Sequence, residues 1–256
     1  MRFSLEGKVA VVTGASRGIG RGIALGFAEQ GADLVLASRS VDALTELASE
    51  IEQLGRRAVV AAADLMDLEE AVSPVEVAVR EFGQLDVLVN NAGGAGAYID
   101  GASNSFFETP IEAIDQLMRL NVVAPAATTR AAAEFMKDHG GGSIINTTSL
   151  VAMIPRGRLH AYSAAKAAMA AFTVAWAESL GPYNIRVNAI APGGVVSGNF
   201  AKYIDTPEKE AEKTAAFPLG RLGQPVDAAA CAIFLASDEA AFVSGASILL
   251  SGARLW

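Results

Sequence analysis

Tyr162 and Lys166 lie four residues apart in an apolar stretch, so a helix through them places a phenol and an amine on the same face. A phenol exchanges protons near neutral pH only if a neighbouring cation stabilises its phenolate, and the Lys166 ammonium is placed to do this. The pair is therefore a candidate acid/base device. In isolation this spacing would more often mean a lysine stem against a ring on a helix surface, so the interpretation depends on other residues.

A glycine-rich segment near the N-terminus supplies the first of these. The β-branched run 8–13 predicts a strand, Gly14-Ala15-Ser16-Arg17-Gly18-Ile19-Gly20 follows it, and residues 21–30 have a helical pattern. Glycines in such a turn permit close backbone approach, and a helix N-terminus offers free N–H groups and a positive dipole to a diphosphate. The strand, turn and helix together predict a dinucleotide-binding site.

The rest of the chain continues to alternate between strands and helices. Strands are expected at 33–37, 58–62, 85–89, 143–148, 185–190 and 247–250, and helices at 41–54, 67–82, 111–139, 161–180 and 226–237. Alternation at this spacing produces right-handed βαβ units and a parallel sheet. We therefore expect an α/β fold, in which residues 1–256 form a single domain with a three-layer, Rossmann-type, doubly wound parallel sheet of about seven strands.

Two features interrupt this pattern. Pro74 lies inside the expected helix 67–82 and should bend or break it, because proline lacks an N–H and crowds the preceding turn. Residues 194–219 form a long segment without clear periodicity, which contains Phe200, Tyr203 and Phe217. Long segments over a sheet edge are often lids, so we expect a substrate lid there.

Composition narrows the function classes. A length of 256 residues and a hydrophobic fraction of 52% suit one large domain, and the net charge of −8 argues against a nucleic-acid surface. One cysteine and two histidines leave no cluster with zinc-ligand spacing, so we expect no metal site. No apolar run reaches the roughly 18 residues that span a bilayer, and the N-terminus lacks a signal-peptide core, so we expect a cytoplasmic protein without a membrane span.

At its motif positions the chain resembles the short-chain dehydrogenase/reductase family, and the resemblance covers essentially the whole chain. The motifs occur in the family's order and near its spacings: Thr13-Gly14-x-x-x-Gly18-x-Gly20, Asn90-Asn91-Ala92-Gly93, Asn121, Ser149, Tyr162-x-x-x-Lys166 and Pro192-Gly193. The chain departs from the family at two places. Ser197 is the nearest match where the family often has a threonine for the carboxamide, and Ser251-Gly252-Ala253 stands where a Gly-Gly pair is frequent.

The resemblance implies an NAD(P)-dependent oxidoreductase that interconverts a ketone and a secondary alcohol by hydride transfer. Tyr162 would be the general acid for reduction, or the base for oxidation, and Lys166 would lower its pKa while hydrogen-bonding the nicotinamide ribose. Ser149 would hold the carbonyl oxygen where negative charge develops, and Asn121 would anchor a water that links the lysine to solvent. These four side chains are the expected catalytic residues.

The cofactor contacts implied by the resemblance lie in the glycine turn and at the ends of later strands. They are Gly14, Ser16, Arg17, Gly18, Ile19, Gly20, Ser38, Arg39, Asp64, Leu65, Asn91, Ala92, Gly93, Tyr162, Lys166, Pro192, Gly193, Val195 and Ser197. An NAD-type member has an acid at the end of the second strand, whereas this chain has Ala37-Ser38-Arg39. Arg39 and Arg17 can instead pair with a 2′-phosphate, so we predict a preference for NADP(H) over NAD(H), with Asp64 near the adenine.

The substrate is a small-molecule ketone or alcohol whose identity the sequence leaves open. The expected walls of its site, at 94–107, 150–159 and 194–219, mix glycine with apolar residues and carry no recognition code. Arg156, Arg158 and His160 could bind an anionic group, although a solvated loop or a subunit contact would explain them as well.

Two alternative functions are kept. One is a 3-oxoacyl thioester reductase of the fatty-acid type, but Glu134 and Glu178 stand on the helix faces where that branch uses arginines to grip an acidic carrier. The other is a non-catalytic NADP(H)-sensing regulator on the same fold, which would typically lack part of the Tyr/Lys/Ser set.

Apolar helix surfaces predict an oligomer. The helix 161–180 and the small-residue run 124–133 carry more apolar surface than one sheet face can cover. We therefore expect a homotetramer whose largest contact is made by the helices holding Asn121 and Tyr162. A second contact would use the last helix and strand, with Ile248, Leu249, Leu250 and Trp256.

Overall fold

The strand order of the central sheet reverses beside its first strand. The structure is a computed structural model that describes residues 3–95, 106–201 and 204–254. Its seven strands form one sheet in the order β3-β2-β1-β4-β5-β6-β7, and every neighbouring pair is parallel. The strands are β1 (Val9–Thr13), β2 (Asp33–Ser38), β3 (Ala58–Ala62), β4 (Val87–Asn90), β5 (Gly142–Thr147), β6 (Ile185–Pro192) and β7 (Ser247–Leu250). The order turns back between β1 and β4, so the expected doubly wound sheet of seven strands is confirmed.

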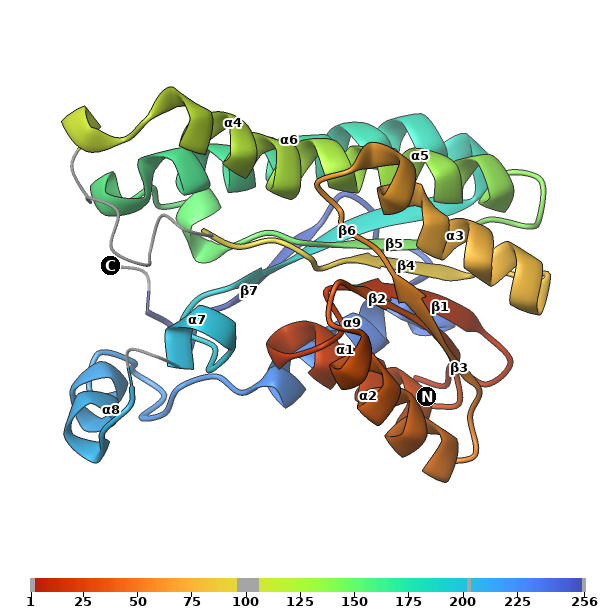
Figure 1. Cartoon of the computed structure of the whole chain (residues 1–256), viewed down its shortest axis with the longest axis horizontal. Coiled ribbons are helices and arrows are strands. Elements are labelled where there is room, and N and C mark those ends of the chain that lie inside the picture. The colour runs from red at the N-terminus through yellow and green to blue at the C-terminus, as the bar shows by residue number, and fades with distance from the viewer. Residues whose placement is uncertain (1–2, 96–105, 202–203, 255–256) are drawn as a thin grey trace.

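Helices cover both faces of this sheet. Figure 1 shows α4, α5 and α6 along one face, and α1, α2 and α9 on the opposite face. The α-helices are α1 (Gly18–Glu29), α2 (Val41–Gln53), α3 (Leu68–Phe82), α4 (Ile111–Met118), α5 (Ala124–Met136), α6 (His160–Leu180), α7 (Gly198–Ala201), α8 (Pro207–Thr214) and α9 (Pro225–Ala236). The short 3₁₀ segments are η2 (Phe106–Glu108), η4 (Leu150–Ala152), η5 (Gly157–Leu159), η6 (Gly181–Tyr183) and η7 (Asp238–Ala240).

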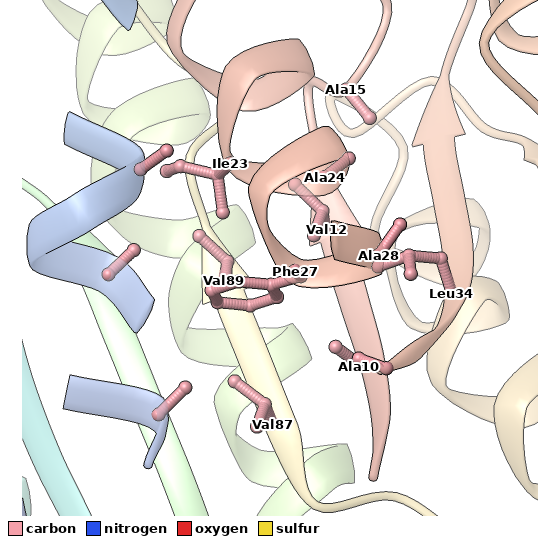
Figure 2. Packing of buried hydrophobic residues seen from close by; sticks show 14 of the residues in the cluster. Ala10, Val12, Ala15, Ile23, Ala24, Phe27, Ala28, Leu34, Val87 and Val89 are labelled. Carbon is pink, nitrogen blue, oxygen red and sulfur yellow. The ribbon is translucent and has the colours of Figure 1, made fainter. Parts of the chain in front are cut away.

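Alternating side chains of the strands divide the core into two layers. In β1, Val12 packs with α1, α2 and α9, whereas Val11 packs with α3 and α5. In the first layer, Ile23 and Phe27 of α1 lie over Val89 of β4 (Figure 2). Burial on both faces explains why the strands are continuous apolar runs. The packed layers hold the ends of the strands in fixed positions.

Pro74 does not break α3, so that part of the prediction is wrong. The helix runs without interruption from Leu68 to Phe82, with Pro74 buried in it. Proline cannot donate to the carbonyl oxygen four residues earlier, which belongs to Glu70. The hydroxyl of Ser73 donates to that oxygen at 2.8 Å. The acceptor is therefore satisfied and the helix continues.

The expected helix 111–139 is three segments. A π-helical turn, η3 (Arg119–Val123), joins α4 to α5. The side-chain amide of Asn121 donates to the carbonyl oxygen of Leu117 at 3.0 Å, which is the acceptor that a regular α-helix would give to the Asn121 N–H. The wider turn therefore occurs where Asn121 has to turn its side chain inward.

The expected lid segment 194–219 contains more regular structure than its sequence indicated. It includes the short helices α7 and α8, and the hydroxyl of Thr206 caps α8 by accepting from the N–H of Lys209 at 3.3 Å. Tyr203, named above as part of this segment, lies outside the described residues. Among the helices that the structure describes, none is long and apolar enough to cross a membrane.

Candidate active site

A cleft of about 1300 Å³ lies at the carboxyl ends of the strands. Its lining includes the residues just after β1, β3 and β4 and the last residues of β2, β5 and β6. Parallel strands bring their carboxyl ends to one edge, and the order reversal between β1 and β4 keeps the crossing chains out of this space. Most of the predicted cofactor residues therefore meet in one cavity. Gly20 and Asn121 do not line it.

The glycine turn after β1 has the shape that a diphosphate requires. Gly14 and Gly18 have φ angles of +65° and +57°, in the left-handed region that favours glycine. No side chain caps the first turn of α1, so its N–H groups face the cleft without a side-chain partner. A Cβ on Gly20 would run into the carbonyl oxygen of Gly14 and the amide of Asn91. Gly20 therefore acts by close packing behind the turn.

Hydrogen bonds join this turn to the loop after β4. The buried hydroxyl of Thr13 donates to the carbonyl oxygen of Val89 at 3.1 Å and accepts from the N–H groups of Asn91 and Ala92 at 3.0 and 3.1 Å. The Asn91 side-chain amide donates to the carbonyl oxygen of Thr13 at 3.0 Å. Ala92 lies so close that a Cβ on Gly14 would stand 2.8 Å from its Cα. Two loops of the predicted cofactor site thus form one unit.

The far end of the cleft carries the residues expected near the adenosine. Ser38 ends β2 and lines the cleft, followed by Arg39, whose guanidinium lies 3.7 Å from the carboxylate of Asp64. The Asp64 carboxylate also accepts from the N–H of Met66 at 3.0 Å, and Leu65 is buried between them. Arg17 is exposed and lines the same cavity. Two arginines, Arg17 and Arg39, therefore line this end of the cavity.

Tyr162 and Lys166 enter the middle of the cleft from α6. The ammonium of Lys166 is buried, donates to the carbonyl oxygen of Thr147 at 2.8 Å and lies 5.8 Å from the centre of the Tyr162 ring. Burial lowers the pKa of Lys166 from 10.5 to about 8. Burial also raises the pKa of Tyr162 to about 12, against the opposing effect of a hydrogen bond with Ser149. The expected fall in the Tyr162 pKa is thus not seen, because loss of hydration outweighs the hydrogen bond.

Ser149 follows β5 and faces Tyr162. Its hydroxyl donates weakly to the carbonyl oxygen of Pro192 at 3.4 Å and accepts from the N–H of Val151 at the same distance. Bonds this long are readily exchanged for a better partner. The hydroxyl groups of Ser149 and Tyr162 can therefore both turn toward one substrate oxygen.

Asn121 lies behind the cleft and is completely buried. Its side-chain amide donates to the carbonyl oxygen of Gly94 at 3.0 Å, and its side-chain oxygen accepts from the Gly94 N–H at 3.0 Å. A Cβ on Gly93 would lie 2.6 Å from that oxygen and 3.2 Å from the Lys166 ammonium. Asn121 thus fixes the loop that passes in front of Lys166. Its expected part in a water relay stays a prediction.

The remaining predicted contacts follow β6. The Gly193 N–H donates to the carbonyl oxygen of Leu250 at 2.8 Å, which ties the turn to β7. A Cβ on Gly193 would lie 2.9 Å from that of Leu150, so only glycine fits beside the η4 segment. Val195 is buried, and the Ser197 hydroxyl donates to its carbonyl oxygen at 3.4 Å. All these residues except Leu250 line the cleft.

The sequence did not indicate Thr147 and Arg254 as residues of the site, whereas it named Phe217 in the expected lid. Thr147 holds Lys166 through a backbone carbonyl, which any residue type could supply. Phe217 and Arg254 line the cleft from the lid segment and the chain end, with the guanidinium carbon 5.0 Å from the ring centre. Arg156 also lines the cleft, whereas Arg158 and His160 do not. In the described parts of the chain, no three His, Cys, Asp or Glu side chains are grouped to hold a metal ion.

Comparison with known proteins agrees with this geometry. A family model described as enoyl-(acyl carrier protein) reductase matches residues 14–252. The 7alpha-hydroxysteroid dehydrogenase of Escherichia coli K12 is 37% identical over 248 residues, which are 97% of this chain and 94% of that protein. An L-rhamnose 1-dehydrogenase (NAD(P)(+)) of Azotobacter vinelandii is 39% identical over 250 residues, 96% of this chain and 95% of that protein.

A solved structure shares the whole fold. It is a 7 alpha-hydroxysteroid dehydrogenase complexed with NADH and 7-oxo glycochenodeoxycholic acid. It superposes with a TM-score of 0.92 at 36% identity, covering 99% of this chain and 96% of that chain. Fold, motifs and near-full-length relatives agree, and the chain therefore belongs to the short-chain dehydrogenase/reductase family of NAD(P)-dependent oxidoreductases.

Proposed function

We propose that this enzyme uses NADP(H) to interconvert a ketone and a secondary alcohol, with Tyr162 as the general acid or base. The observation that carries the proposal is the place of the Tyr162 side chain, which lines the cleft together with Ser149 and has the buried Lys166 ammonium 5.8 Å from its ring centre. The glycine turn at the other end of the same cavity fits a diphosphate. Cyclic secondary alcohols are the first class to test, since the named relatives include hydroxysteroid and sugar dehydrogenases.

The chain's own residues supply the proton and the oxygen contacts. A bound nicotinamide supplies the hydride in reduction and accepts it in oxidation. Ser149 donates a hydrogen bond to the carbonyl oxygen, where negative charge develops. Tyr162 donates the proton to that oxygen, and its pKa of about 12 keeps the phenol protonated at neutral pH. The phenol is therefore available as the acid in the reduction.

Lys166 stabilises the charge that remains on Tyr162 after this transfer. With a pKa of about 8, the amine is largely protonated at pH 7, so a cation stands beside the developing phenolate. An ammonium has three donors, and the carbonyl oxygen of Thr147 takes one. The others remain for a ribose hydroxyl and the phenolate. Asn121 acts through the 93–94 loop that confines this ammonium.

Preference for NADP(H) follows from the charges at the adenosine end. Arg17 and Arg39 line the cavity there, and no acid ends β2. A 2′-phosphate prefers a guanidinium, whereas the free hydroxyls of NAD(H) need an acceptor at that place. Asp64 is the one acid among the described residues that line the cavity, and we place the adenine beside it.

Replacement of Tyr162 by phenylalanine tests the proposal. The variant keeps the ring and loses the proton, so kcat for ketone reduction with NADPH should fall by about 10²- to 10⁴-fold. Tyr183→Phe is the matched control, because Tyr183 lies in η6 with 51% of its surface exposed and should retain full activity. Equal rates in wild type and Tyr162→Phe would refute the assigned role, and turnover of no ketone or alcohol would refute the function.

The two alternative functions remain distinguishable by experiment. The matched family model takes its name from an acyl-carrier reductase, which keeps a 3-oxoacyl thioester substrate in the panel. Glu134 and Glu178 are exposed on α5 and α6 and would repel an acidic carrier. A 3-oxoacyl thioester linked to a carrier protein should therefore be no better as a substrate than the same acyl group on a small thiol. A sensing regulator would bind NADP(H) and turn over none of these compounds.

We further propose that the enzyme is a homotetramer built through α5 and α6. Val123, Phe172 and Val174 are exposed by 41%, 39% and 58%, and the Phe172 ring stacks on Trp176 with centroids 4.9 Å apart. Burial of such a surface against a second copy is favourable. Sedimentation equilibrium should give four chains, whereas a fully active monomer at micromolar concentration would contradict the proposal. Trp256, expected in the second contact, lies outside the described residues.

A further inference from the structure

The cleft concentrates positive charge in an acidic protein. The chain has a net charge of −8. Among the described residues that line the cleft, five are cationic (Arg17, Arg39, Arg156, Lys166 and Arg254), and Asp64 alone is acidic. The proposed function uses Arg17, Arg39 and Lys166. Arg156 and Arg254 have no role in it.

These two arginines reach the substrate end of the cleft from different segments. The backbone N–H of Arg156 donates to the hydroxyl of Ser163 at 3.3 Å, one residue beyond Tyr162. The guanidinium of Arg254 lies over the Phe217 ring. That ring in turn packs against Gly194, in the turn that follows β6. Both arginines therefore line the same cavity as Ser149 and Tyr162.

Among the described residues, none neutralises either guanidinium group. In the part of the chain that the structure describes, no acid forms an ion pair with Arg156 or Arg254, whereas the surface residue Arg221 is paired with Asp227 at 2.7 Å. Arg254 is held by its cation–π contact with Phe217, which leaves its N–H groups available. Cations inside a cleft that have no acidic partner attract an anion from solution.

The backbone also directs Arg254 toward the cleft. Ala253, which stands before it, has a φ angle of +66°, in the left-handed region that a side chain disfavours. Such a conformation persists only where its surroundings enforce it. Here it follows Gly252, which packs beside Phe217. The turn at the chain end therefore presents Arg254 to the cavity.

We propose that the substrate is an oxo acid or hydroxy acid, whose carboxylate is bound by Arg254 and Arg156 while its carbonyl or hydroxyl carbon faces Tyr162. The inference rests on the proposed ketone and alcohol chemistry and adds the substrate class. Guanidinium forks match a carboxylate in shape and charge. The carboxylate takes no part in the hydride or proton transfer, so it contributes binding and orientation.

The test compares each acid with its amide. A cyclohexanone and an oxosteroid are each offered as the carboxylate and as the carboxamide of the same shape, with NADPH as reductant. Wild type should favour the carboxylate in kcat/KM by roughly a hundredfold, as expected for two charge-assisted contacts that each contribute about tenfold. Arg254→Gln and Arg156→Gln should each lower the carboxylate-to-carboxamide ratio by about tenfold, and the double variant should abolish the preference.

Arg158→Gln is the matched control. It removes the same charge two residues from Arg156, from a side chain that does not line the cleft, so the ratio should stay within twofold of wild type. Two results would overturn the inference. One is equal efficiency of wild type with both members of every pair, and the other is a carboxylate-to-carboxamide ratio in the double variant that equals that of wild type. Turnover of the ketones would in both cases still support the proposed function.

Calorimetry separates failure of the inference from failure of the chemistry. Each carboxylate is titrated into NADP⁺-loaded protein, wild type and double variant. Arginine-dependent binding without turnover of any ketone would refute the proposed function and keep the anion site. Absence of arginine-dependent binding and of any carboxylate preference would remove the anion site.

Discussion

The two ends of the cleft are built in different ways. At the cofactor end, backbone geometry decides the shape, since Gly14 and Gly18 take left-handed φ angles and Thr13 joins two loops by three hydrogen bonds. At the substrate end, the cleft is lined by side chains from short segments, such as Leu150 of η4 and Phe217, which follows α8. A diphosphate is common to all nicotinamide cofactors, so one backbone shape can serve. Substrates differ, and side chains on short segments can change without disturbing the sheet.

Glycine substitutions should give the largest difference between the two ends. Gly20→Ala places a methyl group against the carbonyl oxygen of Gly14 and the side-chain amide of Asn91. The first belongs to the backbone, and the second is held by its hydrogen bond to the carbonyl oxygen of Thr13, so neither moves aside easily. We expect a loss of about 3 kcal/mol in the free energy of unfolding together with loss of cofactor binding. Gly157→Ala, at the substrate end, meets no atom within 4 Å and has no positive φ angle.

Urea unfolding and cofactor titration of the two variants measure this contrast. Gly157→Ala should change the free energy of unfolding by at most about 0.5 kcal/mol. Similar stability losses in both variants would show that the cofactor end is no more constrained than the substrate wall, and the comparison would fail.

Lys166 stands where the two ends meet, and its pKa gives the second largest effect. The unfolded chain keeps this proton up to its ordinary pKa of 10.5, whereas the folded protein releases it at about 8. Between these values the unfolded state binds more protons, so the free energy of unfolding rises with pH. The rise should be about 1 kcal/mol per pH unit between pH 8 and pH 10 relative to Lys166→Met. Below pH 8 the difference between the two proteins should be constant.

Denaturant unfolding of both proteins at half-unit pH steps checks this expectation. The series ends at pH 10, because the raised pKa of Tyr162 affects stability with the opposite sign above that value. A difference between the two proteins that stays flat from pH 7 to pH 10 would mean that the Lys166 ammonium is hydrated through the cleft.

The same division explains which features the sequence could predict. The sheet, its helices and the glycine turn follow from periodicity and from positions where only glycine fits, so residue type carries the information. The π-helical turn at Asn121 could not be predicted, because it arises when the side chain takes the carbonyl oxygen of Leu117 from the helix. Continuity of α3 depends on the Ser73 hydroxyl replacing the bond that Pro74 cannot make.

The residues of the site divide in the same way into those that the sequence predicted and those that it did not. The resemblance to the family identified Tyr162, Lys166 and Ser149, whereas Thr147 acts through its backbone carbonyl, which residue type does not reveal. Arg254 comes from the chain end, and only the tertiary path through Phe217 brings it to the cleft. Of Arg156, Arg158 and His160, sequence spacing could not tell that Arg156 alone lines the cavity.

The smallest expected effect concerns the charged side chains at the cofactor end. Arg17 and Arg39 are both exposed, and the Arg39 guanidinium also forms an ion pair with the Asp64 carboxylate at 3.7 Å. Exposed ion pairs contribute little individually, but a 2′-phosphate carries almost two charges and can accept from both guanidinium groups. The double variant Arg17→Ala/Arg39→Ala should therefore lower the ratio of kcat/KM for NADPH to that for NADH by roughly ten- to thirtyfold. The loss should appear mainly as a raised KM for NADPH, since the phosphate is remote from the reacting carbon.

Arg130→Ala is the control, because Arg130 is an exposed arginine of α5 paired with Glu134 and does not line the cleft. A wild-type enzyme that used both cofactors equally well, or a double variant with an unchanged ratio, would show that the backbone alone determines cofactor binding at this end.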